Sequence, residues 1–391
     1  MELYTLDASL RRTEVVDVFE SLIWTEKYRE MGDFELHIDS TPENRKLLVA
    51  GTKLATNTSY RMMEIETITD AVNDDGKQTL KIVGPESVRV LEDRLAKATT
   101  GNLVTDGAWT LTGTPGTIAR KIFTDICVTG TLSQWDKIPF IQPGNLFPAG
   151  TIAEPADSIN YVVEPASVYE AIKKICDTYD MGFRLLRNFD TSQLYFEIYT
   201  GDDRTTSQTT RAPVVFAPEL DNLQNTTELT TYAGVKNVAY VYSDQGYVEV
   251  IAEGTDPEIS GFDRKVLYVK ADNLEGTPTT QQITDYLTQK GVEELAKAKP
   301  LSAFEGEINQ NSTYKYGVDY NLGDLVELRN SDGATNRMRV TEQIFVTDEQ
   351  GDRQYPTLAM NLFITPGSWL AWDYNQIWSD LGLTEYWGNA P

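Results

Sequence analysis

The sequence has almost no histidine, and this scarcity limits the chemistry that the chain can perform. His37 is the only histidine among 391 residues, so a hydrolase that pairs its nucleophile with histidine would depend on this residue alone. Phe34, Leu36 and Ile38 share the apolar face of an alternating segment, residues 33–39. His37 lies on the opposite face, as expected for a period of two residues. We therefore predict a solvated strand histidine without a catalytic role.

Cysteine is also scarce. The two cysteines, Cys127 and Cys176, are too few for a zinc cluster and do not have the CxxC spacing. Each follows the apolar stripe of a predicted helix, which favours two buried reduced thiols. A disulfide between the two helices is the less favoured alternative. We predict no metal site.

Basic residues are few and long apolar runs are missing. The chain has 34 lysines and arginines against 59 acidic residues, a net charge of −25, which opposes binding to a phosphate backbone. No run approaches the ~18 apolar residues of a membrane span, and the first residues do not resemble a signal peptide. We expect a chain that folds in the cytoplasm, has no membrane-spanning segment and does not read nucleic acid.

The common catalytic motifs are also missing: the sequence contains no GxGxxG, Walker loop, GxSxG or HExxH. We therefore predict no catalytic residues and no cofactor. A glycosidase with two acids remains an alternative, because its pair is defined by a distance of ~5–10 Å in space and not by sequence spacing. The candidate pairs Glu64 with Glu66 and Asp202 with Asp203 are more simply explained as solvated charges.

Strand patterns dominate both ends of the chain, with one helix in each. Residues 1–98 predict a small antiparallel β-barrel or curled sheet with a helix that begins at Pro42, and a hairpin that joins residues 63–66 to 80–82. Residues 231–366 predict a second barrel. Its helix is expected to have Thr277 as the cap and Pro278 at the first position.

Residues 99–230 differ from both ends. Apolar stripes at helical period after Pro115 and Pro165 predict two helices, and residues 194–199 predict a strand. The predicted fold is thus mainly β, α+β overall, with two small antiparallel β-barrels that flank an α+β insert. Residues 367–391 form a fourth segment.

This last segment has no lysine or arginine and contains four of the seven tryptophans, Trp369, Trp372, Trp378 and Trp387. Their spacing does not maintain one helical stripe, so an irregular strap is expected. The tryptophans could form a carbohydrate-stacking platform, dock on another protein, or cover the second barrel of the same chain. Docking and the strap are favoured over the platform, because tryptophan is enriched at interface hot spots and in buried anchors. The sequence does not choose between these two.

Three stretches resemble a known family. Residues 21–28 (SLIWTEKY) with 32–36 (GDFEL) resemble the opening of the minor tail proteins of actinobacterial siphophages, a family named after a protein of a Rhodococcus phage. Residues 163–172 (VEPASVYEAI) with 182–184 (GFR) resemble the middle domain of that family. Residues 320–326 (YNLGDLV) resemble its late strand entry. The resemblance runs in order over roughly residues 1–365.

The resemblance implies a structural virion protein at the distal end of the tail, similar in fold to contractile-tail baseplate hubs and the bases of type VI spikes. Three copies would form a pseudo-sixfold ring through which DNA passes without specific binding. The implied partners are the distal tail and tail tube proteins, the tape measure protein and other tip proteins. An acidic lumen would repel DNA, and strand residues are the candidates for it: Glu64, Glu66, Glu305 and Glu307. The alternatives are a tail-associated glycoside hydrolase or peptidoglycan-degrading protein, and a module that binds host glycans.

Overall fold

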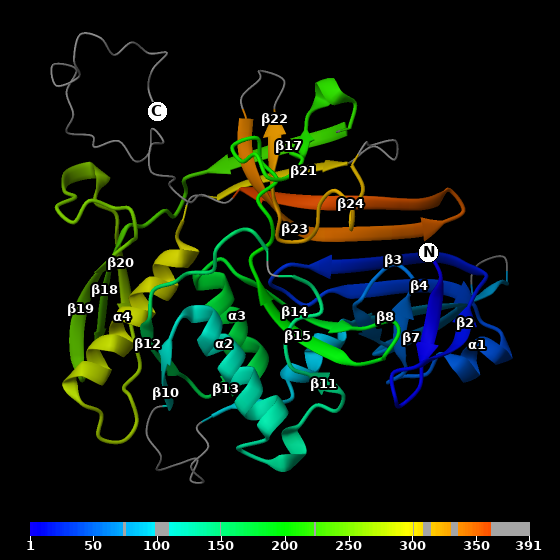
Figure 1. Ribbon diagram of the computed structural model, residues 1–391, viewed down its shortest axis with the longest axis horizontal. Helices are drawn as coiled ribbons and strands as arrows, with labels where there is room; N and C mark the ends of the chain where they lie inside the picture. Colours follow the sequence, from blue (N-terminus) through cyan, green and yellow to red (C-terminus); the bar gives the residue numbers. More distant parts are fainter. Residues whose placement is uncertain are drawn as a thin grey trace.

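The computed structural model describes most of the chain. The described residues are 1–72, 76–97, 109–148, 150–222, 224–299, 301–307, 314–329 and 335–360. Within them, strands outnumber helices, and the helices gather on one side of the largest sheet (Figure 1). The fold is mainly β, as predicted.

Within the described residues, the largest sheet contains ten strands, which come from the N-terminal part of the chain and from residues 215–360. Eight of them follow one another in the spatial order β17 (Gln224–Thr231), β21 (Leu301–Glu307), β24 (Gly351–Met360), β23 (Thr335–Asp348), β3 (Phe19–Lys27), β4 (Asp33–Asp39), β8 (Gln78–Pro85) and β7 (Thr67–Val72). Off this path, β22 (Leu325–Arg329) pairs with β23, and β16 (Val215–Phe216) pairs with β22. All neighbours on the eight-strand path are antiparallel.

The pairing of β3 with β23 joins the two strand-rich ends. It runs from Lys27 opposite Glu342 to Ser21 opposite Asp348, and the Met1 ammonium adds a contact to Asp352 at 2.7 Å. Because β3 uses one edge for β4 and the other for β23, it cannot also close a barrel within residues 1–98. The prediction of two barrels is therefore not confirmed: the described part of this sheet is open. The predicted domain boundaries stay predictions.

A second sheet packs against the N-terminal part of the first. Its spatial order is β2 (Arg12–Val16), β1 (Leu3–Leu6), β5 (Lys53–Thr56) and β6 (Met62–Glu64). Leu3, Leu54 and Met63 of this sheet share a core with Trp24 and Phe34 of the large sheet. The alternation of buried with more exposed residues on β4 and the burial of Leu22 and Trp24 on β3 thus produce two packed layers.

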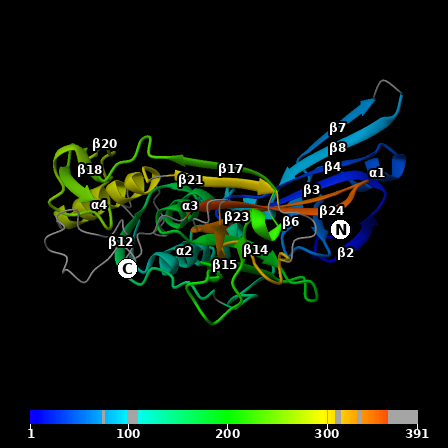
Figure 2. The same ribbon diagram turned by 90° about the horizontal axis from the view of Figure 1, so that it is seen from above.

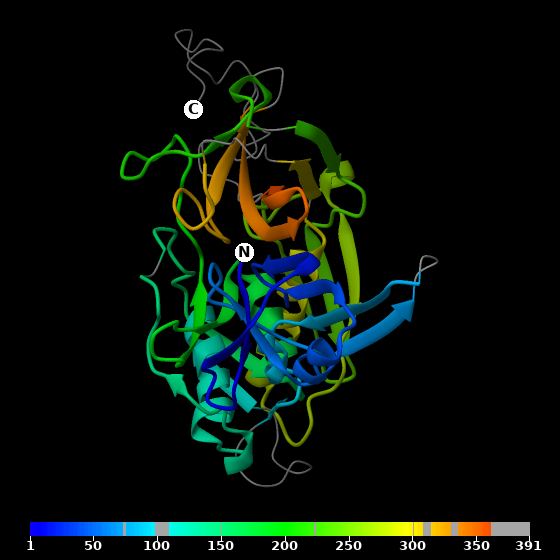
Figure 3. The ribbon, with the colours of Figure 1, turned by 90° about the vertical axis from the view of Figure 1, so that its right-hand side faces the viewer.

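Two local predictions in this region have different outcomes. Helix α1 (Pro42–Leu47) begins as predicted, with the Thr41 hydroxyl accepting a hydrogen bond from the Asn44 N–H. The predicted hairpin partner was wrong, because β6 is buried and pairs with β5. The partner of β8 is instead β7, whose six residues are all exposed. Figure 2 and Figure 3 show the β7–β8 hairpin projecting from the molecule.

The middle of the chain contains the two predicted helices. They are α2 (Pro115–Phe123), continued by a π-helical turn (Thr124–Thr129), and α3 (Val168–Thr178). Ser167 caps α3 through its hydroxyl, which accepts from the Glu170 N–H. The helices pack together and on small sheets whose strands are β9 (Leu95–Ala96), β10 (Trp109–Gly113), β11 (Ile141–Gln142), β12 (Ile159–Val163), β13 (Ala166–Ser167), β14 (Gly182–Arg187) and β15 (Leu194–Tyr199).

A smaller unit lies at the end of the molecule farthest from the β7–β8 hairpin (Figure 1). We call it the peripheral unit: β18 (Val238–Ser243), β19 (Gly246–Ile251), β20 (Val266–Lys270) and α4 (Thr280–Lys297). Its sheet has the order β19-β18-β20, and α4 covers one face. The helix begins two residues later than predicted, because Thr279 and Gln282 form a reciprocal capping box.

Candidate interaction surfaces

A buried polar junction holds the N-terminal strands, the middle region and the C-terminal strands together. Tyr28, which follows β3, is fully buried, and its hydroxyl donates to the carbonyl oxygens of Tyr199 at 3.2 Å and Asp180 at 3.3 Å. Its ring lies between Gly182 and Gly323, where a Cβ atom on either glycine would collide with it. Burial raises the pKa of Tyr28 far above its usual value. The phenol therefore stays neutral.

Arg339 of β23 completes this junction. The guanidinium is 2% exposed and donates to the Thr200 carbonyl at 2.7 Å and to the Gly323 carbonyl. It also pairs with the Asp180 carboxylate at 2.7 Å, which Arg29 contacts as well. Arg339 thus connects the C-terminal strands to the turn between α3 and β14. A buried charge with these partners holds the regions in one arrangement, since losing a partner would leave it unpaired.

A second buried ion cluster lies beside the junction. Arg61 pairs with Glu86 at 2.7 Å and with Glu26 at 3.7 Å, and all three are nearly inaccessible. The Tyr316 hydroxyl donates to Glu26 at 3.1 Å, which links the cluster to the C-terminal region. Burial raises the pKa of Glu86, although Arg61 opposes this effect. The cluster joins distant parts of the chain.

A half-buried ion cluster connects the peripheral unit to α3. Glu164 accepts from Lys174 at 2.6 Å and from Lys290 of α4 at 2.5 Å. Glu293 of α4 is almost fully buried and pairs with Lys174 at 2.8 Å. Burial alone would raise the pKa of Glu164, but the hydrogen bonds from both lysines outweigh it and lower the pKa to about 2. The link between the two regions is therefore ionic at neutral pH.

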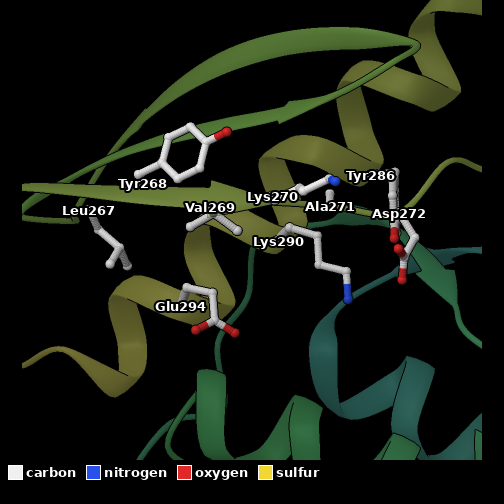
Figure 4. Close-up of a pocket in the computed structure, with 9 residues that line it drawn as sticks. All are labelled: Leu267, Tyr268, Val269, Lys270, Ala271, Asp272, Tyr286, Lys290 and Glu294. Carbon is white, nitrogen blue, oxygen red and sulfur yellow. The ribbon is translucent and has the colours of Figure 1, made fainter.

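A groove of about 320 Å³ lies between the edge strand β20 and helix α4 (Figure 4). It is lined by Leu267, Tyr268, Val269, Lys270, Ala271, Asp272, Tyr286, Lys290 and Glu294. β20 is the last strand of its sheet, so one of its backbone edges is unpaired within the described residues. An unpaired edge beside a helix is suited to receive an extended segment.

The face of the same sheet that points away from α4 carries four tyrosines. Tyr240 stacks on Tyr247 with ring centroids 5.9 Å apart, and Tyr242 lies 5.4 Å from Tyr268. The exposed fractions of Tyr247 and Tyr268 are 61% and 64%, and Figure 4 shows Tyr268 on the side of β20 opposite Lys290. We call these four residues the tyrosine face. Tyrosine offers a large rigid contact area that is both apolar and polar, which suits binding to protein.

The acidic residues predicted for a lumen are only partly described. Glu64 pairs with Lys53 at 2.8 Å, and Glu66 pairs with Arg89 at 3.3 Å. Glu305 and Glu307 lie on β21, but their side chains are outside the described residues. The lumen assignment stays a prediction.

The other residues that the sequence singled out have local partners or lie outside the description. Asp202 accepts from the Thr151 N–H, and Asp203 accepts from the N–H and the hydroxyl of Thr205. These contacts stabilise loops. Residues 361–391 are not described, and the tryptophans in them stay candidates for docking: Trp369, Trp372, Trp378 and Trp387.

The predictions for histidine and cysteine can be checked directly. His37 is a partly exposed strand residue whose Nε2 lies 2.7 Å from the Glu35 carboxylate, which confirms a surface position. Cys127 and Cys176 are free and buried, as predicted, and burial raises the pKa of Cys127 to about 12. Within the described part of the chain, no cluster of His, Cys, Asp or Glu could hold a metal ion. No helix described there is long and apolar enough to span a membrane.

Sequence reasoning missed the buried junction and the tyrosine face. Arg339 and Tyr28 are 311 positions apart, and no local pattern signals their contact. The tyrosine face had a visible signal: Tyr240 and Tyr242 alternate with apolar residues on β18, so their side chains had to share one face.

Comparison with known proteins agrees with this architecture. Residues 1–358 match the model of the Siphovirus ReqiPepy6 Gp37-like protein family. No curated protein matches. Among solved structures, the 43 kDa tail protein of prophage MuSo2 from Shewanella oneidensis has a TM-score of 0.54 at 13% identity, with 92% of this chain and 98% of that chain covered.

A tail protein from Neisseria meningitidis MC58 is similar to the same degree, with a TM-score of 0.54 at 11% identity and coverage of 92% and 96%. At these identities the likeness shows the fold alone. The fold is that of phage tail proteins, which confirms the resemblance seen in the sequence. Because the family model covers nearly all of the described residues, this chain belongs to the Siphovirus ReqiPepy6 Gp37-like protein family.

Proposed function

We propose that the protein is a structural component of the siphophage virion, a homotrimeric hub at the distal end of the tail. The observation that carries the proposal is the match of residues 1–358 to a siphovirus family, together with the tail-protein fold. The hub would adapt a sixfold tail tube to a threefold tip. It would contact the tube proteins, the tape measure protein and other tip proteins, and let DNA pass without binding it specifically.

The ends of the large sheet support assembly into a ring. The sheet ends at β7, from the N-terminal region, and at β17, from the end of the middle region, and the described residues leave both outer edges unpaired. An unpaired edge is a template for another strand. In a closed threefold ring each copy would present one end of its sheet to the next copy, so that no edge stays open.

The proposed hub also includes two β-barrels for each chain. In the ring, β-barrels would close only when neighbouring copies complete the sheets, which agrees with the open sheet of one copy. The inner wall would carry more carboxylates than basic side chains, with Glu64, Glu66, Glu305 and Glu307 as candidates. A wall dominated by lysine and arginine would contradict this, because it would attract the DNA phosphates.

The mass of the purified protein under native conditions tests the trimer. The chain mass is 43.9 kDa, and the expected particle has three times this mass. A strictly monomeric or dimeric particle would contradict a threefold hub. The proposal includes no enzymatic activity, so clear lysis of host cell walls by the isolated chain would favour the glycoside hydrolase or peptidoglycan-degrading alternative.

A further inference from the structure

The hydrogen bonds between β20 and β18 show which backbone groups of β20 lie along its unpaired edge. The Ala271 N–H donates to the Tyr242 carbonyl of β18, and the Lys265 carbonyl accepts from the Val238 N–H. Odd-numbered residues of β20 therefore point their backbone groups toward β18. Because direction alternates along a strand, Tyr268 and Lys270 point their N–H and carbonyl groups away from β18, along the free edge.

The unpaired edge of β20 lies between the groove and the tyrosine face of the peripheral unit. The groove lies on the α4 side of β20, and the tyrosine face lies on the other side. A strand added along the edge would place alternate side chains over the groove and over the tyrosine face. One extended segment can therefore cover both surfaces at once.

The chain itself supplies a segment with the matching chemistry. Residues 361–391 contain no lysine or arginine and carry four tryptophans, and the charges that line the groove balance, with Lys270 and Lys290 beside Asp272 and Glu294. Several tryptophans left in water would expose a large apolar surface, since each buries roughly 150–250 Å² when covered. The segment needs an apolar surface, and the peripheral unit exposes one.

The end of β24 is close enough for this segment to reach. Ala359 lies opposite Ala303 of β21, and β21 begins just after the end of α4. Glu294, in the last turn of α4, lines the groove. By standard backbone dimensions this path from β24 to the groove is at most about 30 Å, which the residues between Met360 and Trp369 span when extended.

We propose that residues 367–391 bind in cis as an additional strand along the free edge of β20, where their aromatic side chains cover the tyrosine face. In an extended run, Trp372, Tyr374 and Trp378 share one side, which would lie beside Tyr268. The opposite side, which contains Asp373, would face the groove. This inference does not depend on the trimeric hub, so the isolated chain suffices to test it.

Hydrogen exchange tests the added strand. The full chain is compared with a chain truncated after Thr365, and the reporter is the β20 peptide that contains Tyr268 and Lys270. We expect exchange at these amides to become about tenfold faster or more on truncation, because the edge loses its hydrogen-bond partner. The opposite edge of the same sheet, β19, serves as the internal control and should not change. Equal β20 exchange in both chains would overturn the proposal.

A matched pair of proline variants tests the same point without truncation. Tyr268→Pro removes an edge N–H on β20. Ile251→Pro removes one on β19, since β19 bonds to β18 through the alternate residues that include Ala252. Proline blocks strand addition at an edge. Tryptophan emission should shift to the red in Tyr268→Pro, because the tryptophans of residues 367–391 become exposed to water, while Ile251→Pro should match the unmodified chain.

Dilution distinguishes cis from trans binding. Protection of β20 that stays constant over a hundredfold dilution supports a segment of the same chain. Protection that falls with dilution assigns the site to the segment of a second copy and overturns the proposal. If both proline variants leave tryptophan emission unchanged and their circular dichroism shows that they are folded, the segment does not bind at β20.

Discussion

The buried junction and the peripheral unit use polar side chains in opposite ways. At the junction, Arg339 and Tyr28 are withdrawn from water and donate to carbonyl oxygens and to the Asp180 carboxylate, which come from three distant parts of the chain. On the peripheral unit, tyrosines stay exposed on a small sheet with a free edge. A buried polar network fixes one arrangement of the regions, whereas an exposed aromatic face offers contact area to another segment. The molecule thus combines a centre that is held by buried polar contacts with a peripheral unit that has a free strand edge and exposed aromatic side chains.

The largest expected effect on stability follows from removing the Arg339 contacts at the buried junction. Arg339→Ala removes the donor to the Thr200 and Gly323 carbonyls and one partner of Asp180. We expect the free energy of unfolding to fall by about 3 kcal/mol, because the buried acceptors lose their partner and a cavity remains. Urea denaturation followed by circular dichroism measures this. A loss below about 1 kcal/mol would show that the junction does not hold the regions together.

A smaller effect is expected at the ionic link between α3 and the peripheral unit. The folded pKa of Glu164 is lowered to about 2 from an unfolded value of about 4.3. The carboxylate therefore stabilises the folded state at and above pH 5, and this contribution is lost as the pH falls from about 4.3 toward 2. Thermal melts of Glu164→Gln and the unmodified chain should differ at pH 7 and converge near pH 2.

The partly exposed position of Glu164 limits the size of this effect, so we expect about 1 kcal/mol at pH 7. A difference in stability between the two chains that does not change with pH would contradict the assignment, because it would show that the amide disturbs packing and not charge. Lys297→Gln is a control, since its pair with Glu294 lies on the exposed surface of the same helix.

The smallest effect is expected on the tyrosine face. Arg264 pairs with Glu249 at 2.9 Å and lies 5.8 Å from the centroid of the Tyr240 ring, but water screens these surface charges. Arg264→Ala should leave the midpoint of thermal unfolding unchanged within error, in contrast to Arg339→Ala. A large destabilisation would show that the face is part of the structural core.

The elements with local signals were predictable from the sequence. The apolar stripes of α2 and α3 and the alternation on β4 predicted their burial correctly. The hairpin partner of β8 could not be predicted, because β7 is wholly exposed and has no apolar face that would indicate a strand. The pairing of β3 with β23 joins residues more than 300 positions apart. Such pairing depends on which edge each strand leaves free, and no single segment encodes this.

Among the candidate site residues and surfaces, those with a local sequence signal were likewise predictable, and those that depend on tertiary contacts were not. The partly exposed histidine and the buried thiols could be predicted from local alternation and helical period. The groove requires β20 and α4 to be placed together, which only the tertiary fold does. The junction requires Tyr28, Asp180 and Arg339 to meet from three regions.

The most direct test of the proposed hub is a density map of the intact tail tip with the fold of this chain placed in it. We expect three copies at the distal end, arranged about the tail axis, with the ends of the large sheets at the contacts between copies and an open channel along the axis. A map that shows one copy, two copies or six equivalent copies, or that places the chain away from the axis, would contradict it.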